Sequence, residues 1–369
     1  MIFPLRADKI AVVTGAIRCG AMLQAIRPTA AEFSVREARG IVLDLFEPNP
    51  RIYWADLLLT VAIGTLCLRL LRRQPLFSPL QVLGYFGAVL AFYRAGSFTH
   101  ELVHLRRGTF KWFGAGWNVL VGIPFLMPSF MYYTHVAHHA RNHYGTPDDG
   151  EYLPLATGPA RNILLYMLQP LAIPVVSVVR FLILAPAGWL IPGLRRWVQQ
   201  RASSLIMDPR YIRPLPSTKE LKIWRVQELA CFLLVACVGL MFATGLLEPS
   251  LLVKFYLLGA GVMLLNQFRT LGAHRFRHRG EELTFIEQLL DSVNYPRHPL
   301  LTELWAPVGL RYHALHHLFP SMPYHALDRA HRRLMAQLPE DSPYRRTNSD
   351  GLWQSIGELW RSARGRRAG

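Results

Sequence analysis

Long runs of apolar residues alternate with short polar and proline-rich stretches along the chain. A helix needs roughly 20 mainly apolar residues to cross a hydrocarbon core about 30 Å thick. Four clean runs approach or exceed that length, at residues 52–71, 76–98, 229–247 and 251–268. Because only short turns join the first two runs and the last two, the pattern predicts four transmembrane helices arranged as two hairpins.

Two further apolar stretches are interrupted by residues that break helices. Residues 112–131 contain three glycines and two prolines, and residues 163–194 contain four prolines and Arg180. We expect both stretches to be interfacial or only partly inserted. The predicted fold class is therefore all-α and integral to the membrane, with two hairpins, interfacial helices and a histidine-rich cap.

The chain divides by composition into three expected segments. Residues 1–51 form an N-terminal cytoplasmic or interfacial segment, residues 52–335 a membrane domain, and residues 336–369 a basic C-terminal tail, of which residues 348–369 are expected to be solvated or to lie along the membrane. The first 30 residues lack the apolar core and small-residue cleavage site of a signal peptide, so we expect none there.

The distribution of charge along the chain predicts how the transmembrane helices are oriented in the membrane. Hydrophobic residues make up 51% of the chain and charged residues 18%, with a net charge of +17. So apolar a chain is not disordered, and its long apolar runs disfavour a soluble nucleic-acid-binding protein. Four spans place 35 of the 41 Lys and Arg residues on one side, which we therefore expect to be cytoplasmic. The exceptions that stand out are Arg69, Arg72 and Arg73, at the opposite turn.

The densest basic loop on the expected cytoplasmic side is a candidate binding patch. Such a patch attracts anionic head groups or an acidic electron-transfer protein, although the positive-inside bias alone accounts for most of the charge. Its members are Arg210, Arg213, Lys219 and Lys222.

Histidines carry the candidate chemistry. They form the motifs HELVH, HVAHH and HALHH, all on the expected cytoplasmic side. Residues three or four apart share a helix face, so the imidazoles of each motif converge, and imidazole suits zinc, copper, iron and nickel. Eight ligands exceed the four of one tetrahedral ion and indicate two metal ions. The eight are His100, His104, His135, His138, His139, His313, His316 and His317.

Two other classes of protein also place histidines in a membrane chain. HExxH alone is typical of zinc peptidases with Glu101 as general base, but that function leaves the HxxHH motifs unused. A metal transporter needs polar groups at mid-membrane depth, whereas these histidines lie at the ends of the runs.

The three motifs, the last continued by LFPSMPYH, resemble the histidine boxes of integral-membrane fatty acid desaturases over roughly residues 50–335. The resemblance implies a non-haem di-iron centre that uses O2 and two electrons to oxidise an unactivated C–H bond. It assigns the eight box histidines as ligands, with His274 as the extra histidine after the last span. Asn266, His143 and His325 are candidate further ligands or neighbours of ligands, and Glu101, Asp148 and Asp149 candidate acceptors for ligand imidazoles.

The resemblance leads us to expect desaturation of a fatty acyl chain. The substrate is a lipid, an acyl-CoA, an acyl carrier or a free acid, bound in an apolar tunnel. A separate donor of the ferredoxin, rubredoxin or cytochrome b5 type supplies the electrons. Lipid hydroxylation and oxidative decarboxylation of a fatty acid to a terminal alkene are alternatives on the same scaffold. Carotenoid modification is a further alternative, and alkane hydroxylation ranks lower.

Overall fold

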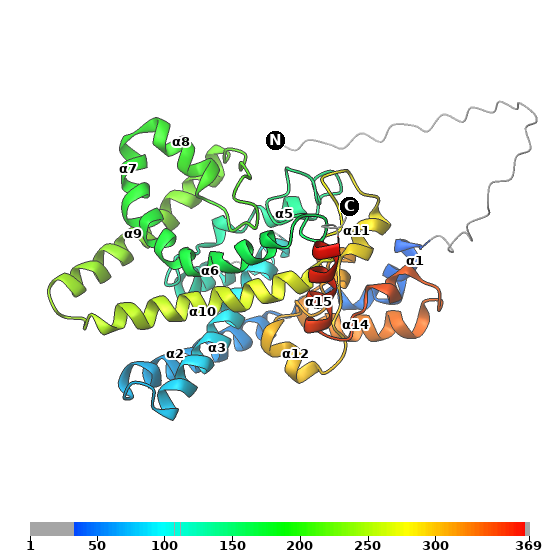
Figure 1. The fold of residues 1–369 in the computed structure, drawn as a ribbon, viewed down its shortest axis with the longest axis horizontal. Coiled ribbons are helices and arrows are strands. Elements are labelled where there is room, and N and C mark those ends of the chain that lie inside the picture. Colours follow the sequence, from blue (N-terminus) through cyan, green and yellow to red (C-terminus); the bar gives the residue numbers. More distant parts are fainter. Residues whose placement is uncertain (1–32, 107, 111, 366–369) are drawn as a thin grey trace, which may run out of the picture.

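The computed structural model describes residues 33–106, 108–110 and 112–365 (Figure 1). These residues form helices joined by loops, with isolated β-bridges and no strand among them. The all-α prediction is confirmed. Expectations that concern residues 1–32 and 366–369 lie outside the described residues.

Four helical segments are long and apolar enough to cross a membrane. They are α2 (Pro50–Arg73), the segment Arg161–Leu190, α9 (Thr218–Ala243) and α10 (Ser250–Ala273). Local sequence signals set their starts: the Asn49 side chain caps α2, and Ser217 and Glu220 form a capping box at α9. The predicted number of spans is confirmed, and three of the four coincide with predicted runs.

One of these four apolar segments lies outside the predicted runs. Helix α3 (Pro79–His104) packs along α2 as the predicted hairpin, but it is not among the four apolar segments because it carries Gln81, Tyr93 and Arg94. The segment Arg161–Leu190, expected to be interfacial or only partly inserted, is instead apolar and long enough to cross. It consists of α6 (Arg161–Val179), the π-helical turn η4 (Arg180–Leu184) and α7 (Ala185–Leu190). Backbone groups freed by proline are tolerated in a span where neighbouring structure satisfies them.

The second predicted hairpin is open rather than packed. Helices α9 and α10 diverge from their shared turn (Figure 1). Helix α9 packs on η4, α7 and η3 (Ser129–Met131), whereas α10 packs on α6 and α3. A short α8 (Pro192–Arg201) packs against α7. The expected break in residues 112–131 is present as α4 (Phe113–Trp117), the π-helical η2 (Asn118–Gly122) and η3.

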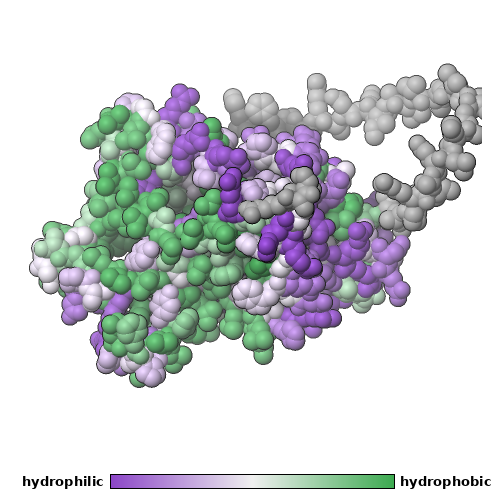
Figure 2. Space-filling view, in the orientation of Figure 1, coloured by the Kyte–Doolittle hydropathy of each residue, from purple (hydrophilic) through white to green (hydrophobic). Residues whose placement is uncertain are grey.

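A cap of shorter elements covers one end of the long helices. Residues of the expected basic tail belong to it: Leu338 and Tyr344 are buried in its core, and α15 (Leu352–Arg364) packs on α10. The described part of that tail is therefore not free in solvent. Figure 2 shows the polar cap at one end and the apolar surface over the long helices. The cap contains α1 (Val35–Ile41), η1 (Leu43–Leu45), α5 (His135–His138), α11 (Phe285–Asp291), α12 (Pro299–Trp305), α13 (His313–Leu318), α14 (Tyr324–Gln337), η5 (Pro343–Thr347) and α15 (Leu352–Arg364).

Candidate metal centre

The histidine boxes meet where α3, α5, α10 and α13 come together. The first box occupies the last turn of α3, the second box forms α5 and its C-terminal cap, and the third box begins α13. His274 directly follows the last residue of α10. Three short helical turns and one helix end thus aim their imidazoles at a common space.

The nine histidines form two groups, and within each group the candidate ligand atoms lie within 4.8 Å of one another. The second and third boxes each contribute to both groups. Group A contains His100, His104, His135, His139 and His316, and group B contains His138, His274, His313 and His317.

Ring nitrogens face one another across these groups. His139 Nε2 lies 3.0 Å from the Nε2 atoms of both His135 and His316. In group B, His274 Nε2 lies 2.9 Å from His313 Nε2 and 3.2 Å from His138 Nε2. A neutral imidazole has one donor and one acceptor nitrogen, so several nitrogens crowded into one space cannot all be satisfied by each other. A shared cation satisfies them together, and the donor set fits one metal ion per group.

Ring nitrogens without a hydrogen-bond partner also indicate a metal site. Both ring nitrogens of His100 are buried without a hydrogen-bond partner among the described residues, and so is His104 Nε2. A buried polar atom without a partner costs folding free energy of about 1–3 kcal/mol. Coordination of a metal ion removes that cost.

Burial keeps most of the cap histidines neutral. It lowers the pKa of the imidazoles well below the usual 6.5 in His135, His139, His274, His313, His316 and His317. Neutral imidazole is the form that binds metal. At His138 burial acts in the same direction, but the Asp149 carboxylate raises the pKa and prevails.

Acceptors orient three of the imidazoles from behind. His138 Nδ1 lies 2.7 Å from Asp149 Oδ2, and His135 Nδ1 lies 2.8 Å from Glu151 Oε2. His274 Nδ1 lies 2.8 Å from the hydroxyl of Tyr144, which donates to Asp291. A carboxylate or hydroxyl on Nδ1 directs Nε2 at the metal.

The contact between Arg269 and His313 affects the position of the imidazole proton in a different way. The Arg269 guanidinium donates to His313 Nδ1 at 3.2 Å. Because arginine only donates, this bond places the proton of a neutral His313 on Nε2. Binding of metal through that nitrogen therefore requires the Arg269 contact to loosen or His313 to lose its proton.

Sequence reasoning found the ligand candidates but only part of this outer layer. Asp149 was a candidate acceptor, and it is buried in that position. Asp148 is exposed, and Glu101 turns away to accept from the Tyr53 hydroxyl and the Tyr324 amide. Glu151, Tyr144 and Asp291 were not identified from the sequence. The one sequence feature that indicates Glu151 is its position as a carboxylate two residues after Asp149.

The remaining candidates lie outside both groups. His143 is half-buried, and His325 Nε2 accepts from the Asn49 amide at the start of α2. Lys219 and Lys222 are exposed, and Arg210 is exposed and paired with Asp208. The inclusion of Arg213 in the surface patch is wrong. Arg213 is buried over the Trp224 ring and donates to the Phe130 and Ser203 carbonyls.

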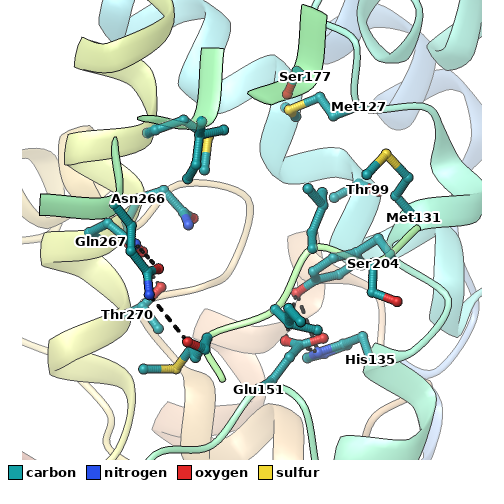
Figure 3. Close-up of a pocket in the computed structure, with 18 of the residues that line it drawn as sticks. Thr99, Met127, Met131, His135, Glu151, Ser177, Ser204, Asn266, Gln267 and Thr270 are labelled. Carbon is teal, nitrogen blue, oxygen red and sulfur yellow. Dashed lines mark hydrogen bonds and ion pairs between the residues drawn. The ribbon is translucent and has the colours of Figure 1, made fainter. Parts of the chain in front are cut away.

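A cavity of about 700 Å³ adjoins the centre (Figure 3). Its inner wall includes His100, His135 and His313, and its outer wall follows α6. There Val175 and Val176 are 55% and 59% exposed, so the cavity reaches the apolar outer surface.

The cavity wall also carries polar groups. Gln267 Nε2 donates to Gln169 Oε1 at 3.2 Å, and Asn266 extends beside them toward the cavity (Figure 3). Thr99 Oγ1 and Ser204 Oγ are buried in the wall without a partner among the described residues. A bound molecule therefore meets apolar surface and unused hydrogen-bonding groups together.

Comparison with known proteins identifies the family. The sequence model of the family described as fatty acid desaturase matches residues 77–348. A ceramide hydroxylase of Caulobacter vibrioides (strain NA1000 / CB15N) is 39% identical over 345 residues, which cover 92% of this chain and 97% of that protein. No solved structure is significantly similar. The chain therefore belongs to the fatty acid desaturase family.

Proposed function

We propose that the protein is an O2-dependent hydroxylase that acts on a ceramide-like membrane lipid. The observation that carries the proposal is a pair of all-histidine groups on the wall of a cavity that reaches the apolar surface. The similar protein named ceramide hydroxylase, matched over almost its whole length, supports this outcome over desaturation.

The two histidine groups would hold two non-haem iron ions, one in group A and one in group B. Such a pair, when bound, activates O2 with two electrons for cleavage of an unactivated C–H bond. In hydroxylation one oxygen atom enters the lipid and the other leaves as water, with two electrons and two protons supplied from outside. Asp149, Glu151 and Tyr144 keep the imidazoles oriented, and burial of the groups limits access of water.

The cavity wall supports a lipid that carries polar groups. A plain acyl chain leaves Thr99 Oγ1 and Ser204 Oγ without partners, which costs free energy. A ceramide-like lipid brings an amide and hydroxyls as well as two apolar chains. Entry from the bilayer past the exposed Val175 and Val176 of α6 brings both the polar groups and the apolar chains of the lipid to the two histidine groups.

Desaturation is the second candidate, and the family match favours it. Both reactions begin with removal of a hydrogen atom from the same kind of carbon. Desaturation then removes a second hydrogen from the neighbouring carbon, whereas hydroxylation transfers oxygen to the first. The position of the substrate relative to the two groups therefore decides the product.

We propose a separate electron donor of the ferredoxin, rubredoxin or cytochrome b5 type, docking on the cytoplasmic side. Among the described residues the groups with metal-binding spacing are the two histidine groups, and none contains cysteine. Exposed Arg210, Lys219 and Lys222 offer a basic surface for an acidic donor.

The test is lipid mass spectrometry of a ceramide-producing host that expresses the chain with a donor and its reductase. We expect an oxygen-dependent gain of one oxygen atom in ceramides. Loss of two hydrogen atoms would instead establish desaturation, and a shortened terminal alkene would establish decarboxylation. No O2-dependent lipid change would overturn the proposal.

A matched pair of variants ties the product to the centre. His316→Ala removes a group A ligand and should abolish product while the protein still inserts in membranes. His298→Asn alters an exposed histidine outside both groups, and asparagine tolerates its left-handed backbone (φ 48°). This control should keep wild-type turnover; full turnover by His316→Ala would contradict the ligand assignment.

A further inference from the structure

A second cavity lies at the opposite end of the long helices from the histidines. It measures about 460 Å³ and is lined by Arg69, Arg72 and Arg73 of α2 and by residues 246–248 and Leu251 around the α9–α10 turn. Figure 1 shows the α2–α3 and α9–α10 turns at one end of the molecule and α5, α11 and α14 of the cap toward the other. Helix α10, with 24 residues, separates this cavity from His274 by about 36 Å.

Its surroundings place this distal cavity at the far membrane surface. Leu76, Phe77 and Leu246 beside the two turns are 69%, 81% and 75% exposed. Apolar side chains so exposed next to arginines fit a boundary between hydrocarbon and head groups. The separation of about 36 Å from the histidines slightly exceeds a hydrocarbon core of about 30 Å.

The three arginines that line this cavity have no carboxylate partner among the described residues. By contrast, Arg94 pairs with Asp56 at 2.6 Å, and Arg180 pairs with Glu228 at 2.5 Å. Arg69, Arg72 and Arg73 form no ion pair among the described residues and are exposed. Three guanidinium groups around one cavity repel each other unless an anion lies between them.

The two turns form a fixed frame around this cavity. Lys254 Nζ of α10 donates to the Arg72 carbonyl at 3.3 Å, which joins the two helix pairs. Within the α2–α3 turn the Phe77 amide donates to Gln81 Oε1 at 2.7 Å. The arginines therefore extend from a defined scaffold rather than from a loose loop.

One acid shares the cavity. Glu248 is exposed, forms no ion pair among the described residues, and contacts Ser250 Oγ at 3.5 Å. A purely anionic ligand has no use for a carboxylate. A headgroup that joins a phosphate to a primary ammonium uses both kinds of group: guanidinium binds phosphate, and a carboxylate binds ammonium.

We propose that the distal cavity binds a phospholipid headgroup of the phosphoethanolamine type from the membrane leaflet opposite the histidines. Arg69, Arg72 and Arg73 hold the phosphate, Glu248 holds the ammonium, and Leu246, Leu247 and Leu251 contact the start of the acyl chains. Such a ligand accounts for the three arginines that lie on the side of the membrane opposite most of the Lys and Arg residues.

The test is lipid retention by the full chain after incorporation in bilayers with equal amounts of phosphatidylethanolamine and phosphatidylglycerol. After extraction into detergent, native mass spectrometry counts the lipids that remain bound. We expect the wild type to retain phosphatidylethanolamine preferentially. Arg69→Gln, Arg72→Gln and Arg73→Gln combined should lower retention about tenfold or more, since each basic residue adds to binding at the surface.

Two comparisons make the result specific. Glu248→Gln should remove the preference for phosphatidylethanolamine over phosphatidylglycerol while lipid is still retained. Arg196→Gln, Arg225→Gln and Arg329→Gln combined remove three exposed arginines outside the distal cavity and should retain lipid as the wild type does. Equal retention by both triple variants, or a wild type without preference between the two lipids, would overturn the proposal.

Discussion

Single carboxylates behind the imidazoles decide how well the centre is preorganised. Asp149 is buried beside His138, and Glu151 lies beside His135, where burial raises the pKa of the Glu151 carboxyl to about 8. A protonated Glu151 is a weaker acceptor for His135 Nδ1 than the carboxylate is. The two acids therefore differ in how strongly they fix their histidines near neutral pH.

Asp149→Asn should weaken metal binding about 10–100-fold, the usual effect of losing an outer hydrogen-bond acceptor. The measurement is iron per protein after dialysis against a chelator of graded strength. Asp148→Asn is the matched control, because Asp148 is the exposed neighbour in the sequence. Equal iron retention by the two variants would show that Asp149 does not orient a ligand.

Glu101→Gln separates the proposed oxygenase from a zinc peptidase. The Glu101 carboxylate accepts from Tyr53 and Tyr324 and belongs to neither histidine group. Glutamine still offers one acceptor oxygen, so the variant should retain iron and most lipid turnover. Complete loss of activity with bound metal retained would instead assign Glu101 a role in catalysis.

At the scale of helices, packing of the cap against the end of α10 positions His274. Gly272 packs so closely on the cap that an added Cβ would lie 2.5 Å from Leu352 Cδ1 and 2.7 Å from the Tyr295 hydroxyl. The same hydroxyl donates to the Gly272 carbonyl. Helix α15, part of the expected solvated tail, thus helps to fix the end of α10 two residues before a candidate ligand.

Gly272→Ala should lower the free energy of unfolding by about 1–3 kcal/mol through overpacking and should reduce metal content as well. Gly357→Ala is the control, since nothing lies within 4 Å of its added Cβ and alanine favours a helix by up to about 1 kcal/mol. Thermal unfolding with and without iron measures both effects. Equal stability of the two variants would contradict the close packing.

The sequence predicted the elements whose determinants are local. Box spacing places imidazoles on one helix face, so His135, His138 and His139 were identifiable from a few neighbouring residues. The Tyr144–Asp291 contact joins residues 147 positions apart and depends on tertiary packing. Likewise, the short turn at Pro249 predicted a hairpin but not that α9 and α10 would pack on different partners.

At the scale of the whole molecule, the buried imidazoles make stability depend on pH. In the unfolded chain they take up protons below about pH 6.5, whereas burial holds their folded pKa lower, to about 4 at His331. The unfolded state then binds more protons, so stability falls as pH drops. His138, Glu151 and Asp291 have raised pKa values and act oppositely, but they are fewer.

We therefore expect the unfolding temperature of the metal-free protein to fall steadily between about pH 7 and pH 5. Differential scanning calorimetry in detergent measures it. Bound metal should add stability at neutral pH, and that addition should disappear over the same range as protons displace the ion. An unfolding temperature that is flat over this range would show that the histidines are not buried as described.

The sharing of boxes between the two groups has a consequence for assembly. Helix α5 and its C-terminal cap place His135 and His139 in group A and His138 in group B, whereas α13 places His316 in group A and His313 and His317 in group B. An ion that immobilises either short helix from one side pre-positions ligands on the other side. Iron should consequently load cooperatively, with little singly occupied protein at half saturation, and a sigmoidal titration would reveal it.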